Sequence, residues 1–274
     1  MTKMAQGEPF THEVKGNLAL RVYPDRRPGN LEIAGIHKAV VLLRSGVEVV
    51  EEGAGFGLPI AKYPDKTFFP GSATLSILEG TPPVAVKTYS MNTISLKSLG
   101  KSRISDKIYQ PIHKNFARVY LSADVLRPVF DTMIGLRDLA GLKTSFVATN
   151  PRGEVEVRYI FYPDHIEIEV RPRLSEGCVE LIMLNEQGAS TFRMYSGEGK
   201  TLVDREMGAW NRINAGEATL SDLNSSVSFT VVRPIGAGFW RGRESVRGRL
   251  SWAGLALSFS DPREVRYTVK ISGE

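Results

Sequence analysis

The stretch EVEVRYIFYPDHIEIEVR, residues 154–171, decides the fold class. Apolar residues alternate with charged ones on both sides of Pro163–Asp164; the apolar set is Val155, Val157, Tyr159, Phe161, Ile166, Ile168 and Val170. Because successive side chains of a strand point to opposite faces, each half predicts a strand with one buried and one charged face. Proline and aspartate favour turns, so the two halves predict an antiparallel hairpin.

The same two-residue period recurs toward both ends of the chain. Residues 18–23 and 264–271 alternate in this way, and residues 39–43 are apolar on both faces, as in a central strand. Apolar residues in 123–139 lie three or four apart, which predicts one short helix. No repeat or low-complexity linker divides the chain. We therefore predict a single all-β domain over residues 1–274: a large antiparallel β-sandwich with one short helix near 123–139.

Composition narrows the class of protein. With 274 residues and 42% hydrophobic content, the chain can bury a sizeable core. It contains no run of about 20 apolar residues and no apolar leader, so we expect neither a membrane span nor a secretory signal. A single cysteine, Cys178, excludes an intrachain disulfide and is typical of a cytoplasmic protein. The net charge of +5 favours anionic partners modestly, and a nucleic-acid-binding role is not favoured.

The stretch VEVVEEGAGFGLPIAKYPDKTFFPG, residues 47–71, concentrates acids, glycines and aromatic residues. If residues 47–52 form a strand with its valines facing the core, Glu51 follows them inward. A carboxylate in such surroundings holds its proton longer, as a general acid or base requires. We therefore predict Glu51 as a catalytic acid/base, with Tyr63 and Asp65 orienting the substrate.

Further residues of this stretch are candidate ligand contacts. The glycines, among them Gly55, allow the backbone to pass close to a ligand, and Glu52 and Lys66 offer polar groups. The alternative is a structural carboxylate in an ordinary glycine loop. A dinucleotide loop is not favoured, because prolines rather than a helix follow the glycines. We expect no cofactor.

The second concentrated stretch is GAGFWRGRESVRGRLSW, residues 236–252. Arginine forks grip carboxylates, sulfates or phosphates, and aromatic faces stack on flat rings. We predict Trp240, Arg241 and Arg243 as ligand contacts and, with Trp210–Arg212, as the best surface for an anionic ligand. The alternative is a solvated arginine edge over an aromatic core, which protects a sheet edge from aggregation.

Local motifs for other chemistry are missing. None of the four histidines stands at metal-ligand spacing, and there is no Cys-x-x-Cys, so we expect no metal site. No Gly-x-Ser-x-Gly supports nucleophilic serine chemistry.

The succession of short strands, with VEVRYIFYPDHIEIEVR as a long hairpin, resembles the β-supersandwich of galactose mutarotase-like proteins. The resemblance implies a carbohydrate ligand. That family pairs a glutamate base with histidine acids around a pyranose, and no histidine here stands in a matching motif. The resemblance therefore transfers no site residue.

Two functional hypotheses follow. The first is a carbohydrate-binding or carbohydrate-active protein, of epimerase, lyase or hydrolase type, acting on a sugar or anionic saccharide. It predicts an aromatic-lined cleft in which Glu51 meets another titratable group. The alternative is a non-catalytic β-sandwich module for interaction or self-association, with Glu51 paired to an arginine. Whether the chain is an enzyme, and whether it forms homo-oligomers, stays open at this point.

Overall fold

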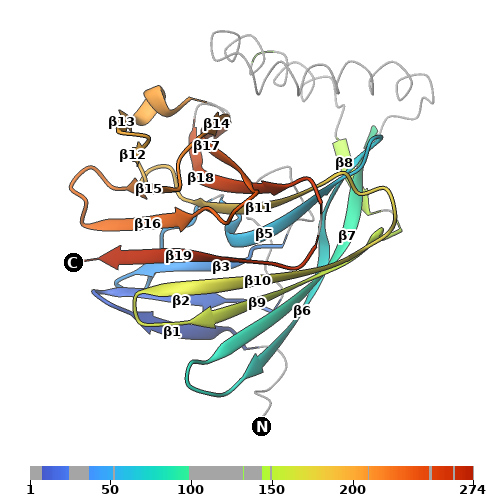
Figure 1. Cartoon of the computed structure of the whole chain (residues 1–274), viewed down its shortest axis with the longest axis horizontal. Coiled ribbons are helices and arrows are strands. Elements are labelled where there is room, and N and C mark those ends of the chain that lie inside the picture. The colour runs from blue at the N-terminus through green and yellow to red at the C-terminus, as the bar shows by residue number, and fades with distance from the viewer. Residues whose placement is uncertain are drawn as a thin grey trace.

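The computed structural model describes residues 8–24, 37–51, 53–98, 132, 144–148, 150–208, 210–246, 249–261 and 263–273, and strands dominate them (Figure 1). One antiparallel ladder joins, in spatial order, β6 (Thr67–Leu78), β7 (Val84–Ser98), β9 (Gly153–Phe161), β10 (His165–Leu174), β19 (Val265–Gly273), β16 (Val227–Val232), β15 (Glu217–Ser221), β12 (Met194–Gly197) and β13 (Lys200–Val203).

A second antiparallel ladder joins β1 (Phe10–Val14), β2 (Leu18–Val22), β3 (Val40–Arg44), β5 (Gly55–Lys62), β11 (Glu180–Gln187), β18 (Arg249–Phe259), β17 (Gly238–Val246) and β14 (Asn211–Ile213). The short strands β4 (Val47–Glu48) and β8 (Thr144–Ala148) pair with β3 and β7, and η2 (Asp204–Met207) is a single 3₁₀ turn. The two ladders join through the short pairing of β5 with β6.

The predicted all-β, antiparallel, sandwich-like fold is confirmed. The hairpin that decided the prediction is present, with Ile166 of β10 opposite Phe161 of β9. The predicted helix at 123–139 lies outside the described residues, apart from position 132. Within the described ranges, no helix has the length and apolar character needed to cross a bilayer.

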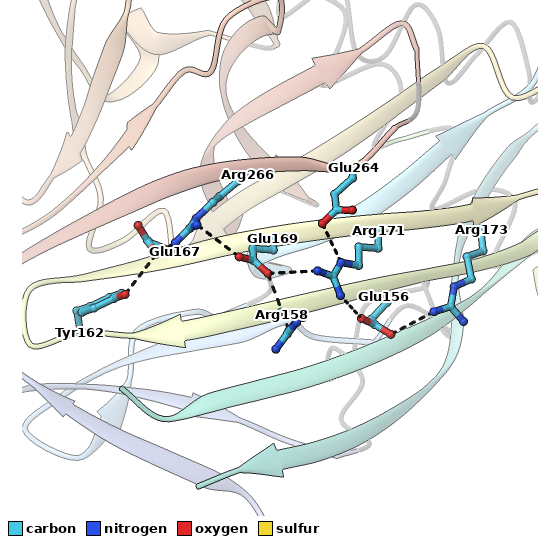
Figure 2. Close-up of polar contacts among 9 residues, drawn as sticks. All are labelled: Glu156, Arg158, Tyr162, Glu167, Glu169, Arg171, Arg173, Glu264 and Arg266. Atoms are coloured by element: carbon cyan, nitrogen blue, oxygen red, sulfur yellow. Dashed lines mark hydrogen bonds and ion pairs between the residues drawn. The ribbon is translucent and has the colours of Figure 1, made fainter. Parts of the chain in front are cut away.

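The two faces of the hairpin have opposite character, as the alternation predicts. The apolar residues of β9 and β10 are buried against the second ladder. The other face carries a charge ladder across β9, β10 and β19 (Figure 2). Arg171 is at its centre, 2.9 Å from Glu264, 3.7 Å from Glu156 and 3.9 Å from Glu169. The pairing of opposite charges keeps this broad face polar and solvated.

A buried polar cluster ties the two ladders together at Gly57. A bulge in the pairing of β5 with β11 leaves Gly57 without a partner in the ladder. Its N–H donates to Oδ1 of Asn185 at 3.1 Å, and its carbonyl accepts from the Tyr159 hydroxyl at 3.0 Å. Tyr89 lies 3.0 Å from that hydroxyl, and Tyr267 donates to the same Asn185 oxygen at 3.2 Å. The bulge is therefore satisfied by side chains of both ladders.

Gly57 has no room for a side chain. A Cβ there would lie 2.9 Å from the ring of Tyr159 and 3.1 Å from Ile168, at a φ of +78°. Gly46 is a matched control, because it has a φ of +79° and nothing within 4 Å of a Cβ. We expect Gly46→Ala to cost about 1 kcal/mol of unfolding free energy through backbone strain. Gly57→Ala should cost a further roughly 1–3 kcal/mol through overpacking. Urea denaturation measures both, and equal losses would contradict this role for Gly57.

The charge ladder generates a second prediction. Among the described residues, Arg171 contacts three carboxylates, whereas Arg173 contacts one, Glu156, and is more exposed. We expect Arg171→Gln to lower the melting temperature more than Arg173→Gln. The difference should shrink in 1 M salt, where the screening length falls to about 3 Å. Differential scanning calorimetry at low and high salt checks this, and a difference independent of salt would contradict an electrostatic origin.

Candidate functional site

The glycine-rich stretch is a strand rather than a loop. Gly55 and Gly57 both lie in β5, at φ values of +86° and +78°. A Cβ at Gly55 would lie 2.6 Å from the carbonyl oxygen of Val40, so this glycine allows β3 and β5 to approach each other. A close approach of the backbone was expected at these glycines, and what approaches Gly55 is a neighbouring strand. The role of Gly55 as a ligand contact stays a prediction.

The strand expected over residues 47–52 ends at Glu48, and the chain turns instead of continuing. Val47 is 69% exposed while Val50 is buried, so the alternation that carried Glu51 inward with the valines is wrong. Glu51 has a φ of 45° in this turn and is half-buried. Its side chain lies against Gly188, where a Cβ would be 2.8 Å from its carboxyl carbon. Glu52 lies outside the described residues.

Tyr63, Asp65 and Lys66 lie at the other end of β5 from Glu51. Eight strand residues separate the two ends, which is about 23 Å at 3.3 Å per residue. The Tyr63 hydroxyl is 3.0 Å from Oγ of Ser175 and 3.1 Å from its carbonyl oxygen. Asp65 and Lys66 are exposed in the turn before β6. The structure does not bring these three residues together with Glu51.

Arg243, by contrast, is brought near Glu51 although 192 positions separate them (243 − 51). It is 7% exposed, and its Nη2 donates to the Ala189 carbonyl at 3.1 Å and lies 3.2 Å from Oδ1 of Asp204. Burial lowers the pKa of the Arg243 guanidinium, and the charges of Asp204 and Glu51 oppose that shift. Arg243 therefore fixes the turn after β11 on which Glu51 rests.

The second predicted arginine also makes an internal contact. Arg241 donates from Nη1 to the carbonyl of Met207, and its guanidinium lies 5.1 Å from the ring centre of Tyr195. Alternation along β17 puts Arg241 and Arg243 on the same face as the buried Phe239. Both arginines are therefore directed toward other parts of this chain.

Three tryptophans gather on the opposite face of β17. Trp210, just before β14, covers Gly242 and Gly254, which are directly opposite each other in β17 and β18. A Cβ at Gly242 would lie 2.7 Å from the Trp210 indole, and one at Gly254 would lie 3.3 Å from it. Trp252 stacks on Trp210 with ring centres 5.3 Å apart and planes 29° apart. The two glycines thus form a floor for a stacked pair of indoles.

Trp240 and Glu186 complete this surface, which we call the tryptophan face (Trp210, Trp240, Trp252 and Glu186). The indole N–H of Trp240 donates to Oγ of Ser258 at 3.1 Å. Glu186 of β11 is 6% exposed and is opposite Gly254, where a Cβ would lie 2.6 Å from its Cγ. Its Oε2 accepts from the Ala54 N–H at 3.1 Å. All three tryptophans are half-buried.

The tryptophan face joins segments that the sequence had suggested only in part. Trp240 and Trp210–Arg212 were predicted as one surface, and β14 does pair with β17. Glu186 was missed, although it follows the apolar run LIML of β11 within the polar stretch NEQ. Its closeness to Trp210 depends on the pairing of β11 with β18, which no local pattern reveals.

In the part of the chain that the structure describes, no three histidines, cysteines or acids lie together in a way that could hold a metal ion. Comparison with family models and with curated proteins found no match.

Among solved structures, similar ones include galactose mutarotase-like proteins. An α-N-acetylgalactosaminidase from Bifidobacterium bifidum matches with a TM-score of 0.51 and 6% identity, over 96% of this chain and 36% of that one. A 4-α-glucanotransferase from Thermococcus litoralis matches with a TM-score of 0.45 and 7% identity, over 98% of this chain and 40% of that one. A galactose mutarotase-like protein from Lactobacillus casei matches with a TM-score of 0.42 and 9% identity, over 97% of this chain and 99% of that one.

This chain therefore spans about two fifths or less of the first two matched proteins. At such low identity the first match shows a shared fold and no more. The fold is one that carbohydrate-active enzymes contain.

The ion pairs of Asp204 with Arg193 and Arg243 predict a pH dependence of stability. Hydrogen bonding from Arg193 and the charge of Arg243 hold the pKa of Asp204 below its usual value, against the effect of burial. Because the pKa of Asp204 is lower in the folded state, the ionised side chain stabilises the fold at pH values above its unfolded-state pKa of about 3.9. This stabilisation is lost as the pH falls through the folded-state pKa. We expect Asp204→Asn to cost about 2 kcal/mol at pH 7, and the gap to wild type to narrow below about pH 4. Urea denaturation of both proteins at pH values from 7 to 2 measures the difference in unfolding free energy. A difference that stays constant over this range would contradict the role of ionised Asp204.

Proposed function

We propose that this chain is a carbohydrate-binding or carbohydrate-active protein whose saccharide stacks on the tryptophan face. The observation that carries the proposal is the stacked pair Trp210–Trp252 on the Gly242–Gly254 floor, with Glu186 beside it. The C–H face of a pyranose is apolar and packs on an indole, while its hydroxyl groups hydrogen bond to carboxylates. Aromatic walls with a few placed polar groups are typical of small-molecule sites.

Two carboxylates lie at this end of β11, and in the proposal Glu186 gives the site its chemistry. Glu186 contacts the glycine floor directly, and Glu51 rests on Gly188, two residues further along the chain. A largely buried glutamate beside a sugar ring is placed to exchange a proton with a hydroxyl or ring carbon. Glu186 is therefore our candidate acid/base, whereas the charge of Glu51 acts on the inward-facing Arg243. The fold shared with an α-N-acetylgalactosaminidase supports the carbohydrate class of the proposal and assigns no residue.

The non-catalytic interaction module remains as a second candidate, and one observation favours it. That hypothesis predicted Glu51 beside an arginine, and the charge of Glu51 does act on Arg243. Under it, Glu51→Gln destabilises the fold and no saccharide binds.

Tryptophan fluorescence tests the proposal directly, because the chain has only three tryptophans and all belong to the tryptophan face. We expect titration with neutral sugars, uronic acids or sugar phosphates to change the emission for at least one class. Trp210→Ala should weaken that binding at least tenfold, and Trp210→Phe should retain part of it. Glu79→Gln, in the exposed turn between β6 and β7, is the control and should bind as wild type does.

Glu186→Gln and Glu51→Gln separate the two candidates. A bound saccharide at 100 times its dissociation constant should add about 2.7 kcal/mol of stability in wild type. Glu186→Gln should reduce that gain while leaving the unliganded fold intact. If no sugar changes fluorescence or stability, and Glu51→Gln melts early, the interaction module replaces the carbohydrate proposal.

A further inference from the structure

The tryptophan face is longer than one sugar ring. The side chains of β18 on this face are, in order, those of Trp252, Ala256 and Ser258, with Gly254 between the first two. Trp252 and Ser258 are six residues apart, which is about 20 Å at 3.3 Å per residue. Trp210 covers Gly254, and Trp240 reaches Ser258 with its indole N–H. The indoles therefore mark both ends of a row and not a single point.

The middle of the row is a buried alanine and its far end is polar. Ala256, directly opposite Trp240, is 3% exposed, so it separates the Trp210–Trp252 pair from Trp240 and offers a ligand no contact of its own. Arg212 of β14 is paired with Trp240 on its other side and is exposed. Arg212 therefore shares a face with Trp240, and its guanidinium has the donors to bind the hydroxyl or carboxylate oxygens of a ring stacked there. Two stacking positions with separate polar neighbours, Glu186 at one and Arg212 at the other, follow from this arrangement.

We propose that the ligand is a linear oligosaccharide of at least three sugar units that lies along β17 and β18. One end unit stacks on the Trp210–Trp252 pair beside Glu186, and the other stacks on Trp240 beside Arg212. This inference rests on the proposed function, since it extends the same face. A monosaccharide fills only one of the two positions and gains no contact from the other.

The test is a chain-length series read by tryptophan fluorescence. The probes are α-1,4-linked glucose, β-1,4-linked glucose and α-1,4-linked galacturonate oligosaccharides, each from one to six units. We expect the dissociation constant in at least one series to fall tenfold or more between one and three units and to level off at greater length. A dissociation constant that does not change with length overturns the inference and leaves the proposed function standing. No response to any probe contradicts both.

Substitutions at the two ends assign the positions. Trp240→Ala should abolish the gain from longer chains and leave the affinity for one unit within twofold of wild type. Arg212→Gln, an exposed change that the fold tolerates, should remove part of the same gain. Trp252→Ala is the matched change at the other end and should weaken every chain length alike. If Trp240→Ala and Arg212→Gln also weaken all lengths equally, the face has one position and the inference is wrong.

Discussion

The backbone of Gly57 imposes the constraint on which the rest of the structure depends. The bulge in β5 removes its N–H and carbonyl from the ladder, and a buried peptide group without partners costs free energy comparable to a lost hydrogen bond. Asn185 and Tyr159 satisfy both groups from opposite ladders. Burial raises the pKa of the Tyr159 hydroxyl well above its usual value, so it stays a neutral donor. The sandwich is thereby closed by oriented hydrogen bonds as well as by apolar packing.

This constraint also sets the geometry of the tryptophan face. Asn185 and Glu186 are consecutive, so fixing Asn185 toward the interior directs Glu186 to the opposite face of β11. The register with β18 then places Glu186 against Gly254, and the chain leading into β5 donates the Ala54 N–H to its carboxylate. The core and the candidate site are thus two faces of one strand. A change that shifts the bulge by one residue would move both.

The hairpin of β9 and β10 could be predicted from the sequence because its apolar residues alternate with polar ones, and each apolar residue of that series is buried. The glycine-rich stretch could not, since Gly55 and Gly57 make room for other strands while occupying strand positions themselves. Grouping Tyr63 with Glu51 failed for a simple reason: nearness in sequence becomes distance once the intervening residues are extended. Trp210 and Trp252 meet only through the pairing of β14, β17 and β18, which depends on contacts across the whole chain.

The sequence suggested one cluster of arginines and tryptophans, but the structure places the arginines and Trp240 on opposite faces of β17. Arg241 and Arg243 are turned inward, where Asp204 and the carbonyls of Met207 and Ala189 engage them. An arginine held this way stabilises the turn after β11 and has fewer donors left for an outside anion. In the proposed site, recognition on the outward face therefore depends mainly on aromatic stacking, which favours ligands with flat apolar surfaces and many hydroxyl groups. That chemistry, more than the net positive charge, is what makes a saccharide the better hypothesis than a simple anion.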